Sequence, residues 1–376
     1  MRPAVIAATG LFTPPESISN DELVECFNTY VERFNAENEA AIAEGKIAAL
    51  LPSSSAFIEK ASGIKSRYVM QKSGILDPEV MRPVIPERSN EELSILAEIA
   101  VKAAEQALER WGKPRERIGA RCAPASNMQR AYPAMAIEDA GGAPGCAGFG
   151  VRHERRLFVG DLRPRDRGGL HRDRHRRRCV LMVNPEICSG SPQFPRPRQP
   201  LHLRRRRDRG DRRARRPGAR RAGDVLGTRL RTQFSNNIRN NAGFLNRAWP
   251  DRPRSAGQIV RADRAQVSVQ GSGAAGVGHD RRSCRRDRAL NCRRSSAMWL
   301  HQANINMNEI IGRRVLGRDP TPEENVIILD DYANTSSAGS IIAFHKRCDD
   351  MVAGDLGLIC SFGAGYSAGT VFVRKR

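Results

Sequence analysis

Apolar residues in this chain recur at helical spacing in some stretches and form short unbroken runs in others. From position 93 to 107, apolar residues lie three or four positions apart, which predicts an amphipathic helix that runs to Trp111 and ends at Gly112. Ser89 and Glu92 form a capping-box pattern at its expected start. The periodic residues are Leu93, Leu96, Ala100, Ala103 and Ala107.

Short apolar runs predict strands, and a second periodic stretch, Ala338 to Cys348, predicts a helix. The alternation of strands with helices favours an α/β protein built in layers. The predicted strands are Val5 to Gly10, Arg121 to Ala125, Val326 to Leu329, Leu356 to Cys360 and Thr370 to Val373.

Three arginine-rich segments interrupt this pattern. Residues 139–179, 191–224 and 252–297 together hold 35 arginines, 11 acidic residues and no lysine. The whole chain has a formal net charge of +22, yet outside these segments acidic residues slightly outnumber basic ones. The sequence therefore resembles an ordinary, slightly acidic protein with three poorly foldable segments inside it.

Two interpretations of these segments are possible. Residues 203–220, LRRRRDRGDRRARRPGAR, have no apolar period and strong like-charge repulsion, which is typical of a disordered basic linker. Alternatively, GC-rich coding DNA translated in the wrong frame gives the same bias towards arginine, glycine, proline and alanine. We favour the second interpretation because all three segments use arginine and never lysine.

Length and composition set further limits. A chain of 376 residues can bury a large core, as one large domain or as two similar halves. No apolar run reaches the roughly 18 residues of a membrane span, and the N-terminus lacks the layout of a signal peptide. The nine cysteines form no CxxC pair, which argues against a zinc site and a secreted disulfide framework. We therefore expect a cytoplasmic protein without a metal or a membrane partner.

Three motifs near the C-terminus carry the candidate chemistry. His301 opens the tetrapeptide HQAN, Asn334 lies in YANTSSAG, and a glycine loop has the sequence SFGAGYSAG over residues 361–369. In this order and spacing they resemble the C-terminal half of β-ketoacyl-ACP synthase III, a condensing enzyme. The segment GIKSRY at residues 63–68 also resembles a stretch of that family. The resemblance implies a duplicated thiolase-like fold of α-β-α-β-α layers, with halves at residues 1–185 and 186–376.

The resemblance also implies roles and partners. It assigns catalysis to His301 and Asn334, an oxyanion-binding loop to Gly363, Ala364 and Gly365, and supporting positions to Asn304 and Phe362. It implies acyl-CoA and malonyl-ACP as substrates, an acyl carrier protein as partner, a homodimer, and no cofactor. The family often has arginine two residues after the asparagine of HQAN, near the carrier-docking surface. Here that position is Asn306, so Arg313 and Arg314 are candidate substitutes.

The chemistry of the implied reaction explains the histidine and the asparagine. Malonyl-ACP loses carbon dioxide, and negative charge develops on the thioester oxygen of the resulting enolate. Two neutral N–H donors stabilise that oxygen in a site that excludes water, and neither adds a competing charge. His301 and Asn334 match the pair of residues that supplies these donors in the family.

The cysteine nucleophile of the family is missing from this chain. Cys122 and Cys188 are better interpreted as small buried residues, and Cys146 and Cys179 lie in or beside the first arginine-rich segment without a nucleophile motif. However, one permitted codon set for Val151 to Arg163, read one nucleotide later, gives FDMNVACSSATF, which looks like the family's nucleophile motif. The cysteine codon would then lie across the boundary between Leu157 and Phe158.

The other two segments support the same frame. Shifted in the same way, residues 195–210 can give RDRDSHFIFGDVATA, which resembles an FGD segment of the family. Residues 264–277 can give GRKSLSKEVVPLV, a plausible amphipathic helix. We predict that the chain as written does not condense acyl groups and at most decarboxylates a malonyl thioester. The alternatives are an arginine-rich nucleic-acid-binding protein on a degenerate enzyme scaffold and a pseudogene product without function.

Overall fold

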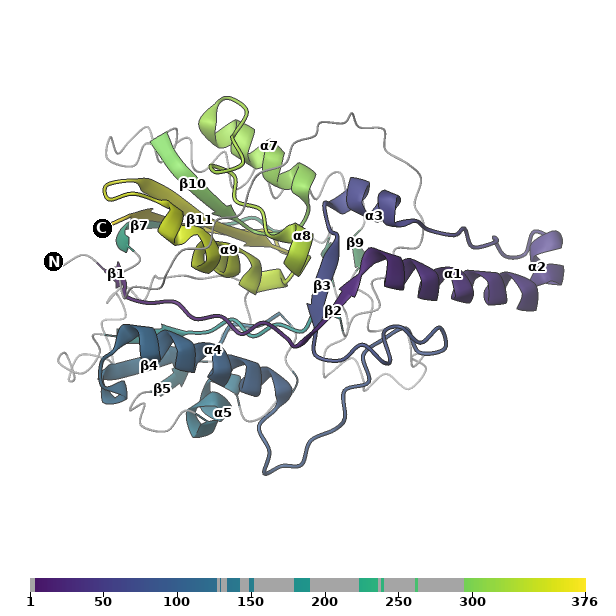
Figure 1. Cartoon of the computed structure of the whole chain (residues 1–376), viewed down its shortest axis with the longest axis horizontal. Coiled ribbons are helices and arrows are strands. Elements are labelled where there is room, and N and C mark those ends of the chain that lie inside the picture. The colour runs from purple at the N-terminus through teal and green to yellow at the C-terminus, as the bar shows by residue number, and fades with distance from the viewer. Residues whose placement is uncertain are drawn as a thin grey trace.

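The computed structural model describes residues 4–126, 129, 134–142, 149–151, 179–189, 223–235, 238–239, 261–262 and 294–376. They form a C-terminal region around a five-stranded sheet, an N-terminal region around a three-stranded sheet, and a helical arm that projects from both (Figure 1).

The C-terminal sheet has the strand order β1-β7-β12-β11-β10. Strands β10 and β11 are parallel, and the other neighbours are antiparallel. The strands are β1 (Val5–Ile6), β7 (Gly223–Thr232), β10 (Ser295–Leu300), β11 (Leu356–Gly363) and β12 (Ser367–Arg374).

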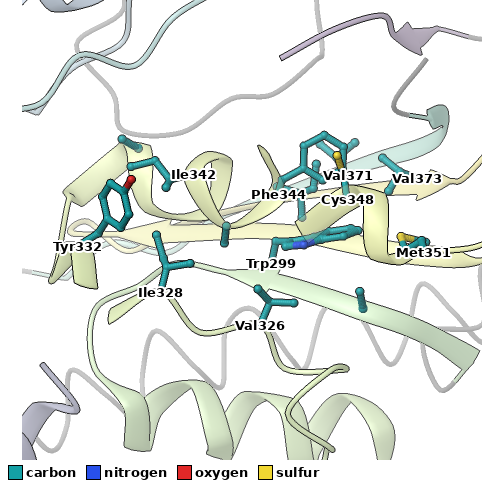
Figure 2. Close-up of a cluster of buried hydrophobic side chains, with 14 residues drawn as sticks. Trp299, Val326, Ile328, Tyr332, Ile342, Phe344, Cys348, Met351, Val371 and Val373 are labelled. Atoms are coloured by element: carbon teal, nitrogen blue, oxygen red, sulfur yellow. The ribbon is translucent and has the colours of Figure 1, made fainter. Parts of the chain in front are cut away.

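Both faces of this sheet are buried, because successive side chains of a strand point to opposite sides. Trp299, Ile359 and Val371 face helix α9 (Gly339–Arg347) in the apolar cluster of Figure 2. Met298 and Leu358 face helix α7 (Ile305–Leu316) in a second cluster. Two buried faces explain why the strands are continuous apolar runs and not alternating ones.

The N-terminal sheet is parallel, with the order β5-β4-β6. Its strands are β4 (Ile118–Cys122), β5 (Phe149–Val151) and β6 (Cys179–Met182). Helix α4 (Ile95–Trp111) and helix α5 (Met135–Gly142) accompany this sheet (Figure 1). The short 3-10 helix η1 (Arg115–Arg117) leads into β4.

The arm begins with strand β2 (Glu16–Ser19), which pairs with strand β3 (Ser66–Val69). Between them lie helices α1 (Asn20–Glu37), α2 (Glu39–Ala43) and α3 (Ser55–Ser62), of which α1 and α2 extend away from the body (Figure 1). Lys65 donates its backbone N–H to the carbonyl of Asp330 in helix α8 (Leu329–Tyr332), so the base of the arm is tied to the C-terminal region. Strands β8 (Ile238–Arg239) and β9 (Arg261–Ala262) form a separate pair.

Several predicted elements begin or end elsewhere. The helix predicted from Ser89 begins at Ile95, because Ser94 is its N-cap and accepts a hydrogen bond from the Ala97 N–H; Ser89 and Glu92 form a turn instead. As predicted, the helix ends at Gly112, whose φ of 62° suits glycine. The strand predicted at Arg121 to Ala125 lies three residues earlier, and the one predicted at Val5 to Gly10 is only two residues long.

The strand predicted at Val326 to Leu329 is wrong. Only Asn325, just before it, forms an isolated bridge to Met298 of β10, and Leu329 already begins α8. The Val326 N–H still donates to the Met298 carbonyl of β10, but the Val326 carbonyl and the Ile328 N–H are hydrogen-bonded to the side chain of Gln302, so the pairing does not continue. The run is nevertheless buried, as an apolar run should be.

The arginine-rich segments are described only in part. Strands β5 and β9, the start of β7 and the first half of β10 fall within them, so these stretches do form strands. Residues 139–142 of α5, Cys179 of β6 and Arg294 are also described, and the remainder of each segment, including Leu157 and Phe158, lies outside the described residues.

Candidate active site

His301 follows directly after β10. The parallel register that pairs Leu300 with Cys360 brings the end of β10 beside the end of β11. There the His301 ring packs edge-on against the buried ring of Phe362, with centroids 5.0 Å apart and planes at 83°. The sheet therefore fixes the histidine at the carboxyl end of its strand, against an apolar wall.

Gln302 joins His301 to the chain segment that leads to Asn334. Its side chain is completely buried, and its amide nitrogen donates to the carbonyls of Leu300 (2.8 Å) and Val326 (3.1 Å). Its amide oxygen accepts from the N–H of Ile328 at 3.0 Å. The sequence analysis gave Gln302 no role, although a fully buried amide must be hydrogen-bonded and here bridges two backbone segments.

Asn334 lies in a tight turn between α8 and the 3-10 helix η4 (Ser336–Ala338). Its side-chain oxygen accepts a hydrogen bond from the Ser336 N–H at 2.9 Å. Ala333 and Ser336, on either side, have φ values of 53° and 51°, which are uncommon for residues other than glycine. The side chain of Asn334 is exposed. Because the oxygen is engaged in the turn, the amide N–H₂ group is the part that can donate outward.

The glycine loop is the turn of the β11–β12 hairpin, whose last pair is Gly363 with Ser367. Gly365 has a φ of 130°, a conformation that favours glycine. Its carbonyl accepts from the N–H of Ser235 at 2.6 Å, and the Tyr366 carbonyl accepts from Gln233 at 2.8 Å. The residues that follow β7 therefore hold this loop, and Ala364 lies at its tip between the two glycines.

Asn304 caps a helix. Its side-chain oxygen accepts from the N–H of Asn306 at 2.9 Å at the start of α7, and its nitrogen donates to the Ala61 carbonyl at 2.7 Å. The side chain thus connects the HQAN motif to the base of the arm.

A half-buried carboxylate, Glu186, links the Asn334 turn to the N-terminal region, and no sequence motif predicted this role. It accepts from the N–H (2.9 Å) and the hydroxyl (2.6 Å) of Ser126, and from the N–H (3.3 Å) and the hydroxyl (2.5 Å) of Ser337. Burial raises the pKa of Glu186, and the hydrogen bonds from Ser126 and Ser337 oppose that rise. Glu186 stands in a segment, VLMVNPEICSG, whose only sequence signal was an apolar run.

Comparison with known proteins identifies the family. Residues 288–375 match the C-terminal family of 3-oxoacyl-(acyl-carrier-protein) synthase III. A β-ketodecanoyl-(acyl-carrier-protein) synthase of Pseudomonas aeruginosa is 44% identical over 379 residues, which cover 94% of this chain and 100% of that protein. The chain belongs to the β-ketoacyl-ACP synthase III family. A β-ketoacyl-ACP synthase III of Rhodopirellula baltica is 40% identical over 81 residues, 21% of this chain and 23% of that protein.

Solved structures of β-ketoacyl-ACP synthases III confirm the fold class. The enzyme of Aquifex aeolicus superposes with a TM-score of 0.59 at 15% identity, over 98% of this chain and 99% of that chain. The enzyme of Pseudomonas aeruginosa has a TM-score of 0.58 at 15% identity, over 100% and 98% of the two chains. The thiolase-like α/β fold predicted from the motifs is therefore confirmed, whereas the boundary at residues 185 and 186 stays a prediction.

Two cysteines in the described part of this β-ketoacyl-ACP synthase III homologue, Cys348 and Cys26, are unsuited to nucleophilic attack. Burial raises the pKa of Cys348 to about 11, and burial also raises the pKa of Cys26. A reactive cysteine needs the opposite shift. Cys122 and Cys179 lie in the parallel strands β4 and β6, and Cys188 lies six residues beyond β6.

Membrane and metal sites were also expected to be absent. Within the described part of the chain, no helix is long and apolar enough to cross a membrane. Among the same residues, no three His, Cys, Asp or Glu side chains group closely enough to hold a metal ion. The absence of a cofactor and the cytoplasmic location remain predictions.

Proposed function

We propose that the gene of this family member encodes a 3-oxoacyl-ACP synthase III that condenses an acyl-CoA primer with malonyl-ACP. The observation that carries this proposal is the pair of neutral donors, His301 and Asn334, in a chain 44% identical to a β-ketodecanoyl-ACP synthase over nearly its whole length. The name of that relative favours an octanoyl primer, because malonyl adds two carbons on condensation.

His301 and Asn334 would act when malonyl-ACP breaks down. The bond between the malonyl methylene carbon and its carboxylate breaks, carbon dioxide leaves, and the electron pair forms an enolate. N–H groups of His301 and Asn334 donate to the enolate oxygen, where they lower the barrier most if they are already in place. The enolate carbon then attacks the acyl-cysteine thioester and the cysteine thiolate leaves; without an acyl group, the enolate takes a proton from water instead.

The nucleophile is part of the same proposal. We place its codon across the boundary between Leu157 and Phe158, as TGT within CTG TTC. The alignment with the Pseudomonas relative covers 94% of this chain and so runs through most of the arginine-rich segments. This coverage supports the proposal that the arginine-rich segments stand at positions where the relative has ordinary enzyme sequence. Resequencing the DNA across codons 135–300 tests this directly, and an unbroken frame that encodes the arginines would overturn it.

Activity measurements separate the two parts of the proposal. The chain as written should release carbon dioxide slowly from malonyl thioesters, but should form no acyl-cysteine detectable by intact-protein mass spectrometry. The protein from the corrected frame should gain the mass of one acyl group from acyl-CoA and form 3-oxoacyl-ACP. An acyl-cysteine on the chain as written would contradict the frame-shift proposal. Failure of the corrected protein to condense would contradict the proposed function.

We also propose that the enzyme works as a homodimer in the cytoplasm and accepts malonyl groups from an acyl carrier protein. The acidic carrier would dock near α7, where Arg313 and Arg314 are both exposed. Arg313 already forms an ion pair with Asp319, so Arg314 is the better candidate. The arginine-rich nucleic-acid-binding alternative receives no support from the comparisons.

A further inference from the structure

Glu186 occupies the point where two regions of the chain meet. Parallel strands β4 and β6 pair Cys122 with Met182, so their carboxyl ends lie at the same edge of the sheet. Ser126 follows β4 and Glu186 follows β6, and both therefore reach the same place from one edge. Ser337 reaches it from the loop that carries Asn334, 151 positions along the chain from Glu186.

The hydrogen bonds at this point are directed towards the carboxylate. Besides the four donors from Ser126 and Ser337, the Ser336 hydroxyl donates to the Ser126 oxygen at 2.9 Å. The amide nitrogen of Asn184 donates to the Ser337 hydroxyl oxygen at 3.3 Å. Each serine hydroxyl gives its one proton to Glu186 and accepts the further bond with a lone pair of its oxygen, so both chains of hydrogen bonds end on the carboxylate, which only accepts.

The turn that these bonds hold is a strained one. Ala333 and Ser336 both have positive φ values, a backbone conformation that is unfavourable for a residue with a side chain. A strained conformation persists only where the surrounding structure holds it. Glu186 binds the backbone and hydroxyl of Ser337 directly, and it binds the Ser336 hydroxyl through Ser126.

The consequence for Asn334 is direct. The Ser336 N–H donates to the Asn334 amide oxygen and so orients this side chain. The hydroxyl of the same residue, Ser336, is held by Ser126. We propose that Glu186 is a positioning residue for the condensing reaction, which fixes the 333–337 turn so that the Asn334 N–H₂ group points to the enolate oxygen. This inference rests on the proposed function, in which Asn334 is one of the two donors.

The test compares two carboxylates that are bound alike. Glu186→Gln keeps the shape of the side chain but presents an N–H₂ group to hydroxyls that have to donate. Glu138→Gln is the matched control, because Glu138 is a buried carboxylate that accepts from the N–H and the hydroxyl of one serine, Ser94, at the start of α4. Both variants are made in the full chain and assayed for decarboxylation of a malonyl thioester.

Glu186→Gln should lower kcat about tenfold to a hundredfold with little change in KM, because misplacing a donor by about 1 Å has effects of this size. Glu138→Gln should leave kcat within about twofold. In an Asn334→Ala background, Glu186→Gln should lower kcat no further, because the two residues act as a unit. A purely structural role would instead lower kcat in both backgrounds.

Hydrogen exchange supplies a readout independent of activity. In Glu186→Gln, the amides of peptides spanning residues 332–340 should exchange faster, while those of β11 should not change. An unaltered chain that releases no carbon dioxide overturns the donor roles proposed for His301 and Asn334 and, with them, this inference. An active chain whose kcat and exchange are unaffected by Glu186→Gln overturns the positioning role alone.

Discussion

The C-terminal region and the N-terminal region differ in the size of the apolar core that their residues form. In the C-terminal region, the central strands are covered on both faces, by α7 and by α9. The N-terminal cluster around Leu96 is smaller and contains three alanines among its five buried residues. Of the arginine-rich segments, residues 139–179 fall in the N-terminal half, and residues 191–224 and 252–297 fall in the first part of the C-terminal half predicted at residues 186–376.

The difference also divides the candidate site. His301, Asn334 and the glycine loop all come from the C-terminal region, and the family's nucleophile would come from the first arginine-rich segment. The N-terminal region still reaches the site through Ser126 and Glu186. The donors proposed for the enolate oxygen therefore lie in the C-terminal region, and Ser126, Asn184 and Glu186 of the N-terminal region contact the Asn334 turn.

Matched core substitutions should give the largest difference between the regions. Leu358→Ala, in the C-terminal sheet, should lower the free energy of unfolding by about 4–5 kcal/mol, whereas Leu96→Ala should cost about 2–3 kcal/mol. Both leucines are almost fully buried, but a site lined by small alanines can collapse more easily. Urea unfolding measures the cost, and hydrogen exchange assigns it to a region. Equal losses would show that the two cores are equally well packed.

Removing a donor should affect chemistry more than stability. His301→Ala or Asn334→Ala should lower the decarboxylation kcat by about a hundredfold to a thousandfold, as for other donors to a developing oxyanion. His345→Gln, a histidine change on α9 away from this pair, serves as the control and should leave kcat unchanged. If either alanine variant kept the full rate, the C-terminal region would not be the chemical half of the enzyme.

Gln302→Leu tests the link within the C-terminal region. Leucine fills a similar volume, but the Ile328 N–H and the carbonyls of Leu300 and Val326 lose their partner. Leaving such buried groups unsatisfied should cost about 2–3 kcal/mol of unfolding free energy. Thermal and urea unfolding measure this cost, with Gln302→Glu as a variant that retains an acceptor for Ile328. A neutral result would mean that the segment before α8 holds its place without this amide.

The pH dependence of the unfolding free energy tests the junction between the regions at His345. Its ring nitrogen bonds the Thr9 hydroxyl at 2.8 Å, and burial, with the Arg110 charge, lowers its pKa to about 4. The unfolded chain takes up a proton near pH 6.5, so this contribution to stability is present above that pH and is lost as the pH falls towards 4. The half-exposed ring limits the loss to about 1 kcal/mol. His345→Gln should remove this slope between pH 7 and 5; an unchanged slope would contradict the assignment.

Local patterns predicted the elements whose contacts are local, and failed where distant residues decide. The apolar pattern alone predicts helix α9 and strands β11 and β12, because each of these elements buries its own apolar residues. The predicted strand at Val326 failed because the side chain of Gln302, 24 positions away, binds the carbonyl of Val326 and the N–H of Ile328. The contacts of Glu186 span 60 and 151 positions, and no short motif announces them.

Arg314 gives the smallest expected effect and tests whether the C-terminal region also recognises the carrier. It lies exposed in the last turn of α7, beside Arg313, which is paired with Asp319. Arg314→Ala should raise KM for malonyl-ACP about twofold to fivefold, the size of an exposed charge contact. KM for malonyl-CoA should not change, because it lacks the acidic protein surface. Arg347→Ala, on helix α9 at the opposite face of the sheet, is the control. The effect should vanish in high salt, where exposed charges are screened; equal changes for both substrates would place Arg314 in the substrate channel and not on a carrier-docking surface.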